Sequence, residues 1–159
     1  MKEITVHFIV NGMEYEIQTA PNRTLLDLLR EDLGLTGAKD GCGGEGECGA
    51  CTVLLDGSPV NACLVLAGQA DQRDVVTVEG LATEEGLHPL QKAFVENGAV
   101  QCGFCTPGAI MSAVGLLKKV PDPTEAQIRE ALSGNLCRCT GYTKMVSAVK
   151  NVAKEMSRE

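Results

Sequence analysis

The sequence predicts an α+β protein made of a strand-rich first half and a helical second half. Apolar residues alternate with a period of two in the first half and recur with a helical period from about residue 87. The eight cysteines fall four in each half, and the net charge is −8 over residues 1–80 but +1 over residues 81–159. We therefore expect two domains, residues 1–79 and 87–159, joined by a polar, glycine-containing linker at residues 80–86.

The first half is expected to form a small sheet folded over one helix. Strands at residues 4–10 and 13–19 flank Asn11-Gly12, a dipeptide that favours a tight hairpin turn. Thr24 and Asp27 match a capping box at the start of a helix of about ten residues that Gly34 is placed to end. Further strands are expected at residues 52–55, from residue 60 onward, and at 74–78.

The second half is expected to form four helices, at residues 87–97, 107–119, 124–133 and 142–156, where apolar residues recur at helical spacing. Thr106 is placed to cap the second of these, with Pro107 at its first position. Thr124 and Gln127 match a capping box at the start of the third.

Composition narrows the class of protein. Eight cysteines are about 5 % of 159 residues, below the roughly 8–10 % of a disulfide scaffold. No apolar run reaches the roughly 18 residues of a membrane span, and polar residues near Met1 interrupt any signal-peptide core. We expect a cytoplasmic protein whose cysteines bind metal. The acidic balance argues against a nucleic-acid partner.

The first cysteine set lies in a glycine-rich loop. Its members are Cys42, Cys48, Cys51 and Cys63, and five of the eleven positions from 41 to 51 are glycine. Glycine lets backbone N–H groups approach sulfur and form an anion-binding nest, which suits the negative charge of a 2Fe-2S cluster. The spacing is close to the plant-type ferredoxin pattern, but five residues rather than four separate the first two cysteines.

The second cysteine set precedes two predicted helices. It comprises Cys102, Cys105, Cys137 and Cys139, in the segments Gln-Cys-Gly-Phe-Cys-Thr-Pro-Gly and Gly-Asn-Leu-Cys-Arg-Cys-Thr-Gly-Tyr. Helix N-termini favour thiolate charge, and Arg138 adds a positive charge between two ligand candidates. Each half thus supplies the four thiolates of one 2Fe-2S cluster or one zinc site.

These two segments resemble the signature of the iron–sulfur subunit of the molybdenum hydroxylases, the family of xanthine dehydrogenase, aldehyde oxidoreductase and carbon monoxide dehydrogenase. The resemblance covers nearly the whole chain. It implies a ferredoxin-like β-grasp domain and a four-helix-bundle domain, each with one 2Fe-2S cluster. It also implies a large molybdopterin-binding partner subunit and an FAD-binding partner subunit.

By the same resemblance, Gln101 and Cys139 are the cofactor-binding residues expected nearest the pterin. Electrons would pass from the molybdopterin centre through the second cysteine set to the first set and out to FAD. The chain would then be the electron-transfer subunit of an oxidoreductase complex, with no catalytic residue of its own, and substrate chemistry would occur in a partner.

Two other functions fit parts of the sequence. A structural zinc-binding adaptor would use the same eight cysteines, although Cys137-x-Cys139 is short for a zinc knuckle. A free ferredoxin-like carrier would keep the clusters but needs only one of them. His7 and His88 pair with neither cysteine set along the sequence, which argues against a Rieske-type site.

Overall fold

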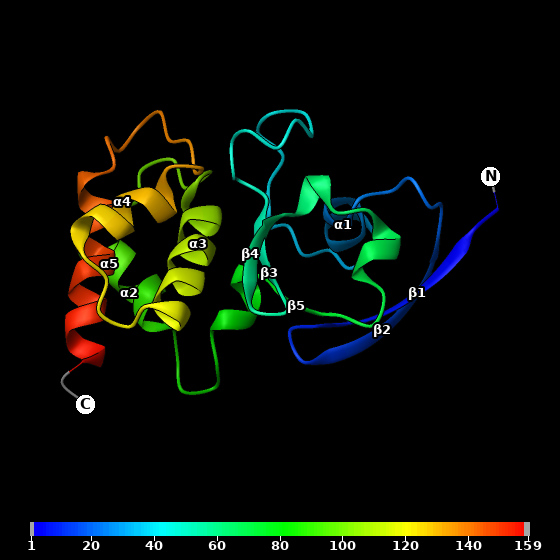
Figure 1. The fold of residues 1–159 in the computed structure, drawn as a ribbon, viewed down its shortest axis with the longest axis horizontal. Helices are drawn as coiled ribbons and strands as arrows, with labels where there is room; N and C mark the ends of the chain where they lie inside the picture. The colour runs from blue at the N-terminus through cyan, green and yellow to red at the C-terminus, as the bar shows by residue number, and fades with distance from the viewer. Residues whose placement is uncertain (1, 158–159) are drawn as a thin grey trace.

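The computed structural model describes residues 2–157 (Figure 1). Residue 1 and residues 158–159, the outer ends of the two predicted domains, lie outside the described residues. Figure 1 shows a strand-rich half beside a helical half, in the order that the sequence predicts. Within residues 2–157, no helix combines the length and apolar character needed to cross a membrane.

The first half is built on a five-stranded sheet of order β2-β1-β5-β3-β4. Its strands are β1 (Ile4–Val10), β2 (Met13–Thr19), β3 (Thr52–Leu55), β4 (Ser58–Asn61) and β5 (Asp74–Val76). β1 pairs antiparallel with β2 and parallel with β5, and β3 pairs antiparallel with β4 and β5. The predicted hairpin turn is confirmed, because Asn11 and Gly12 have φ values of 53° and 81°.

One helical segment covers the sheet. It runs through α1 (Leu25–Asp27) and the π-helix η1 (Leu28–Asp32), so it is shorter than the ten residues expected. The predicted capping box is present, since the Asp27 N–H donates to Thr24 Oγ1 and the Thr24 N–H to Asp27 Oδ2. The buried side chains of this segment are all leucines and hold it against the sheet; they are Leu25, Leu26, Leu28 and Leu29.

Three short 3-10 helices complete the first half and the segment that leads from it to the second half. They are η2 (Ala62–Leu64), η3 (Ala67–Ala70) and η4 (Val78–Leu81). Strand β5 stops at Val76, two residues before the predicted end, because the chain turns into η4 there. The predicted linker at residues 80–86 therefore begins inside η4, and the domain division at this segment stays a prediction.

The four predicted helices are present as α2 (Pro89–Glu96), α3 (Thr106–Lys119), α4 (Glu125–Leu132) and α5 (Thr143–Met156). Thr124 and Gln127 form the predicted capping box of α4. The predicted cap of α3 is wrong by one residue: Thr106 is the first helical residue, and Cys105 stands at the N-cap without a side-chain bond.

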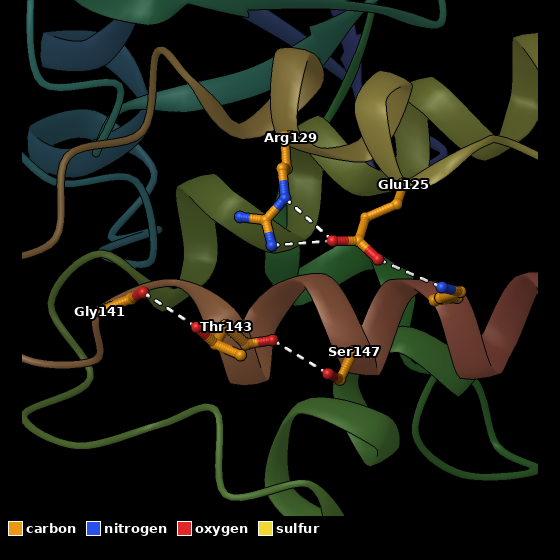
Figure 2. Close-up of polar contacts among 6 residues, drawn as sticks. Glu125, Arg129, Gly141, Thr143 and Ser147 are labelled. Atoms are coloured by element: carbon orange, nitrogen blue, oxygen red, sulfur yellow. Dashed lines mark hydrogen bonds and ion pairs between the residues drawn. The ribbon is translucent and has the colours of Figure 1, made fainter.

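Polar contacts join α4 to α5 on the outer surface. Glu125 accepts hydrogen bonds from the Arg129 guanidinium on its own helix and from Lys150 Nζ on α5, at 2.8 Å and 3.2 Å (Figure 2). These groups are exposed to water, which screens their charges, so the pairs add little to stability. The buried apolar faces of the helices hold this half together.

The two halves share an apolar interface through β3 and α3. All four residues of β3 are buried, because Val53 and Leu55 pack in the core of the first half while Leu54 packs among the helices. Gly115 of α3 lies so close to Pro59 that a Cβ there would overlap it. Helix α3 therefore rests directly on the β3–β4 hairpin, which fixes the cysteine loops of the two halves relative to each other.

Candidate iron–sulfur sites

The first cysteine set gathers around one end of the β3–β4 hairpin. Cys42 and Cys48 lie in the loop that leads to β3, and Cys51 immediately precedes that strand. Cys63 lies in η2, just after β4. Because Thr52 pairs with Asn61, the antiparallel hairpin brings Cys51 and Cys63 to the same end. Both of these are buried, whereas Cys42 and Cys48 are half-buried.

Backbone amides surround the outer sulfur of this set. The N–H groups of Cys48, Glu47 and Gly46 donate to Cys42 and lower the pKa of its thiol to about 7. At Cys63, burial is the main cause that raises the pKa to about 12, and the neighbouring Cys51 raises it further. The Cys42 thiolate forms readily, while the buried Cys63 thiol needs a nearby cation to ionise, as in a metal-binding loop.

The loop accommodates its extra residue through left-handed glycines. Gly43, Gly44 and Gly46 have φ values of 72°, 85° and 74°. The Asp40 carboxylate accepts hydrogen bonds from the N–H groups of Gly43 and Gly44, at 2.8 Å and 3.1 Å. Only glycine adopts successive left-handed conformations at little cost. The five-residue gap from Cys42 to Cys48 is thus a tight, hydrogen-bonded turn.

The second cysteine set gathers at the ends of two helices. Cys102 and Cys105 lie in the loop before α3, and Cys137 and Cys139 lie between α4 and α5. The sulfurs of Cys102 and Cys139 are 3.7 Å apart on the exposed side. All four cysteines line one hollow of about 580 Å³, and Cys48 of the first set lines it too.

The inner pair of this set has unequal acidity. Burial is the main cause that raises the pKa of Cys105 to about 12, with the adjacent Cys137 adding to it. Burial would also raise the pKa of Cys137, but hydrogen bonds led by those from Thr140 lower it to about 7. At the exposed pair, the neighbouring Cys102 raises the pKa of Cys139.

The cysteine geometry fits two irons per set better than one metal ion. Cys102 stands beside Cys139, Cys105 beside Cys137, Cys42 beside Cys48, and Cys51 beside Cys63. A tetrahedral zinc site needs four ligands around one ion, whereas a 2Fe-2S cluster divides its four thiolates between two irons.

The other predicted site residues are also placed by the structure. Gln101 donates from Nε2 to the Cys139 carbonyl oxygen at 3.0 Å, so these two residues lie together on the exposed side. Arg138 lines the same hollow as the second cysteine set. His7 lies beside Glu16 on the β1–β2 hairpin, and His88 caps α2; neither joins a cysteine set.

The two cysteine loops touch each other directly. The Leu136 N–H donates to the Cys48 carbonyl oxygen at 2.8 Å, and Asn135 Nδ2 donates to the Gly49 carbonyl oxygen at 2.9 Å. Asn135 is 4 % exposed. The sequence alone predicts no role for Asn135, although it lies two residues before Cys137. The one indication in the sequence is an amide side chain next to a cysteine motif.

Comparisons with known proteins agree with this geometry. Residues 8–84 match the family described as "2Fe-2S iron-sulfur cluster binding domain", and residues 77–150 match "[2Fe-2S] binding domain". These matches favour 2Fe-2S clusters over the zinc-adaptor alternative in both halves.

Individual relatives match along nearly the whole chain. The nicotinate dehydrogenase small FeS subunit of Eubacterium barkeri is 56 % identical over 94 % of this chain and 95 % of its own length. A probable xanthine dehydrogenase subunit of Bacillus subtilis is 43 % identical over 99 % of this chain and 90 % of its own length. The crystal structure of quinoline 2-oxidoreductase from Pseudomonas putida 86 superposes with a TM-score of 0.93 at 42 % identity, covering 99 % of this chain and 98 % of that one.

With two 2Fe-2S domains and close relatives over nearly its full length, the chain belongs to the small iron–sulfur, electron-transfer subunits of the molybdenum hydroxylases.

Proposed function

We propose that the chain passes electrons in one direction, from a molybdopterin centre in a large partner subunit to FAD in another. The helical half would receive them and the strand-rich half would deliver them. A 2Fe-2S cluster, when bound, accepts and releases one electron at a time. The chain's residues hold the clusters, orient them and exclude water, while substrate chemistry takes place in a partner.

The proposal assigns one cluster to each cysteine set. Cys42, Cys48, Cys51 and Cys63 would hold the cluster of the strand-rich half, and Cys102, Cys105, Cys137 and Cys139 that of the helical half. The glycine-rich loop and its backbone N–H groups support the first assignment, and the hollow lined by four cysteines supports the second.

The observation that carries the direction is the unequal exposure of the second set. Cys102 and Cys139 are exposed, while Cys105 is buried. Gln101 lies on the exposed side with its amide on Cys139, so this side is available to an external pterin. The N–H of Leu136, the residue before Cys137, donates to the Cys48 carbonyl oxygen, so Cys137 lies on the side next to the first set. The entry side thus faces outward and the exit side faces the first set.

The cysteine ligands also suit the cytoplasm, which we propose as the site of action. All eight cysteines are free in the structure. A reducing compartment keeps such thiols available for iron. Loss of the clusters from protein isolated directly from the cytoplasmic fraction under anaerobic conditions would contradict this assignment.

Purification of the native complex tests the proposed partners and their order. We expect molybdenum and FAD to co-purify with this chain, together with about four irons and four sulfides per chain. In the partly reduced complex, the molybdenum EPR signal should be split by the cluster of the helical half. Cys139→Ser, which removes the EPR signal of the helical cluster, should abolish this splitting, and Cys42→Ser should leave it. The opposite result in the two variants would show that the order of the clusters is reversed.

Gln101 provides a finer test of the pterin-facing side. Gln101→Ala is expected to weaken the magnetic interaction between molybdenum and the helical cluster while both remain bound. Gln18→Ala, which alters an exposed glutamine on β2 of the other half, is the matched control. Equal splitting in the Gln101 variant and the control would exclude a pterin-facing role for Gln101.

The domain division is part of the same proposal, with units at residues 1–79 and 87–159 joined by 80–86. Two separate apolar cores support it, and residues 82–87 are all exposed. A protease specific for glutamate should therefore cut the native chain first at Glu84 or Glu85. First cleavage within either proposed domain would contradict the division.

A further inference from the structure

Thr140 makes an unusual contact with a cysteine of the helical half. Its hydroxyl oxygen lies 3.1 Å from Cys137 Sγ, and its backbone nitrogen lies 3.4 Å from the same sulfur. Within residues 2–157, Cys137 is the one cysteine whose sulfur accepts a hydrogen bond from a hydroxyl group. The contact is half-buried, so water competes with it only weakly.

The neighbouring hydrogen bonds orient the hydroxyl toward the sulfur. The Tyr142 N–H donates to Thr140 Oγ1 at 3.3 Å, which occupies a lone pair of that oxygen and leaves its proton to point elsewhere. Met145 Sδ, the other sulfur nearby, is farther away at 3.9 Å. A thiolate is also a better acceptor than a thioether. The Thr140 hydroxyl therefore points its proton toward Cys137 Sγ and donates a hydrogen bond to that sulfur.

Tyr142 closes this arrangement into a ring of three hydrogen bonds. The Cys137 N–H donates to the Tyr142 hydroxyl oxygen at 2.7 Å. The Tyr142 N–H donates to Thr140, and Thr140 donates back to Cys137. Tyr142 has a φ of 67°, a left-handed conformation that non-glycine residues rarely adopt. The local backbone strain indicates that the surrounding structure holds this ring in place.

We propose that Thr140 is a positioning residue that raises the reduction potential of the helical cluster through its hydrogen bond to Cys137. This inference rests on the proposed role of Cys137 as a cluster ligand. Reduction adds one electron and no proton, so the negative charge on the thiolates grows. A hydrogen bond to a thiolate stabilises the more negative state and so favours reduction.

The electron that arrives in this step comes from the molybdenum-containing partner and leaves to the cluster of the first set. Thr140 keeps its proton throughout. Because Leu136, the residue before Cys137, donates its N–H to the Cys48 carbonyl oxygen, the contact favours the extra charge on the side next to the first set. Thr140 thus acts where electrons are passed on within the chain.

A redox titration of the full chain, purified with its clusters and followed by EPR, tests the proposal. Thr140→Val removes the hydroxyl and preserves the shape of the side chain, whereas Thr140→Ser retains the hydroxyl. We expect Thr140→Val to lower the equilibrium constant for reduction of the helical cluster about tenfold, which is about 59 mV for a one-electron couple. Thr140→Ser should stay near the unaltered chain, and the first-set cluster should not shift in either variant.

Thr143→Val is the matched control. Thr143 Oγ1 donates to the Gly141 carbonyl oxygen at 3.5 Å (Figure 2), and no sulfur among the described residues accepts its hydrogen bond. Its removal should leave both potentials unchanged. If Thr140→Val does not retain iron, Thr140→Ala replaces it in the titration, because alanine removes the same hydroxyl with a smaller side chain.

Three outcomes overturn the proposal. One is an unchanged helical potential in a Thr140→Val chain with full iron and sulfide content. The second is an equal shift of both clusters, and the third is a Thr140→Ser potential that follows Thr140→Val. Failure of the underlying assignment looks different: if Cys137 is not a ligand, Cys137→Ser leaves the helical EPR signal intact.

Discussion

The N–H of Leu136 donates to the carbonyl oxygen of Cys48 at 2.8 Å, so the backbones of the two cysteine loops are bonded to each other directly. Leu136 is bonded directly to Cys137, and Cys48 belongs to the other set. This hydrogen bond and a few covalent bonds therefore form a short path between the two proposed clusters. Any change that separates the loops is expected to weaken electronic coupling between the clusters as well as the packing of the two halves.

Asn135→Ala is expected to loosen this connection. The substitution removes one donor to the Gly49 carbonyl oxygen, which still accepts the Thr52 N–H and hydroxyl. The cost is therefore that of one ordinary hydrogen bond, about 1 kcal/mol. We expect a lower unfolding temperature and a weaker magnetic interaction between the two reduced clusters in EPR spectra.

Asn61→Ala is the control for this change. Asn61 Nδ2 also donates to a loop carbonyl, that of Gly46, at 2.8 Å, but both residues belong to the first half. It should reduce stability without altering the interaction between clusters. Identical EPR spectra for unaltered and Asn135→Ala chains would exclude Asn135 from holding the loops together.

Gly49→Ala is expected to disrupt the contact from the other side. Gly49 has a φ of 65°, and a Cβ there would overlap the Gly134 carbonyl oxygen and the Asn135 amide. Gly12→Ala shares the left-handed strain, at φ 81°, but has open space around it. The control should lose about 1–2 kcal/mol of stability from backbone strain alone. Gly49→Ala should lose more and release the helical half from the sheet, as measured by hydrogen exchange at α3; equal losses would contradict the role of close packing.

Local signals in the sequence predicted the features whose bonds join neighbours in the chain. Asn11-Gly12 strongly favours a tight turn, so the strands on either side follow at Ile4–Val10 and Met13–Thr19. The capping pair Thr24 and Asp27 marks a helix start because its bonds are made between residues three apart. Such features depend on neighbours in the chain, which the sequence displays directly.

Features that depend on distant residues were not predictable in this way. The π-helical turn at Leu28–Asp32 widens the helix as its leucines pack against the sheet, and local propensity carries no sign of it. The contact of Asn135 with Gly49 joins positions 86 residues apart. The run Thr52–Leu55 shows no alternation of buried and exposed residues, because both faces of β3 are covered. The sequence pattern alone does not indicate which elements cover them.

Gly115→Ala tests the packing of α3 against the β3–β4 hairpin. In the interior of a helix, alanine normally stabilises by about 1 kcal/mol relative to glycine. Here a Cβ would overlap the ring of Pro59, so the substitution forces α3 away from the β3–β4 hairpin. We therefore expect a net loss of stability in thermal unfolding, opposite in sign to the helix propensity. A gain in unfolding temperature would show that the interface yields without cost.

The pH dependence of stability is expected to report on His88. Its pKa lies below the ordinary value of 6.5, mainly because the side chain is buried and partly because Lys118 is near. Its Nδ1 also accepts the Leu90 N–H at 3.1 Å, which requires the neutral ring. Below about pH 6.5, His88 therefore takes up a proton in the unfolded chain but stays neutral in the folded chain. The free energy of unfolding falls with pH until the pH reaches the lower pKa of the folded chain.

His88→Asn isolates this contribution. Asparagine is a good N-cap but does not titrate, so the variant should match the unaltered chain near pH 8. As the pH falls below about 6.5, the unaltered chain should lose unfolding temperature faster than the variant, because only its unfolded state gains the His88 proton. Thermal unfolding at a series of pH values measures the difference between the two chains, which cancels the titration of groups that they share. Parallel curves from pH 8 to pH 5 would show that His88 titrates alike in the folded and unfolded states, and that its cap on α2 survives protonation.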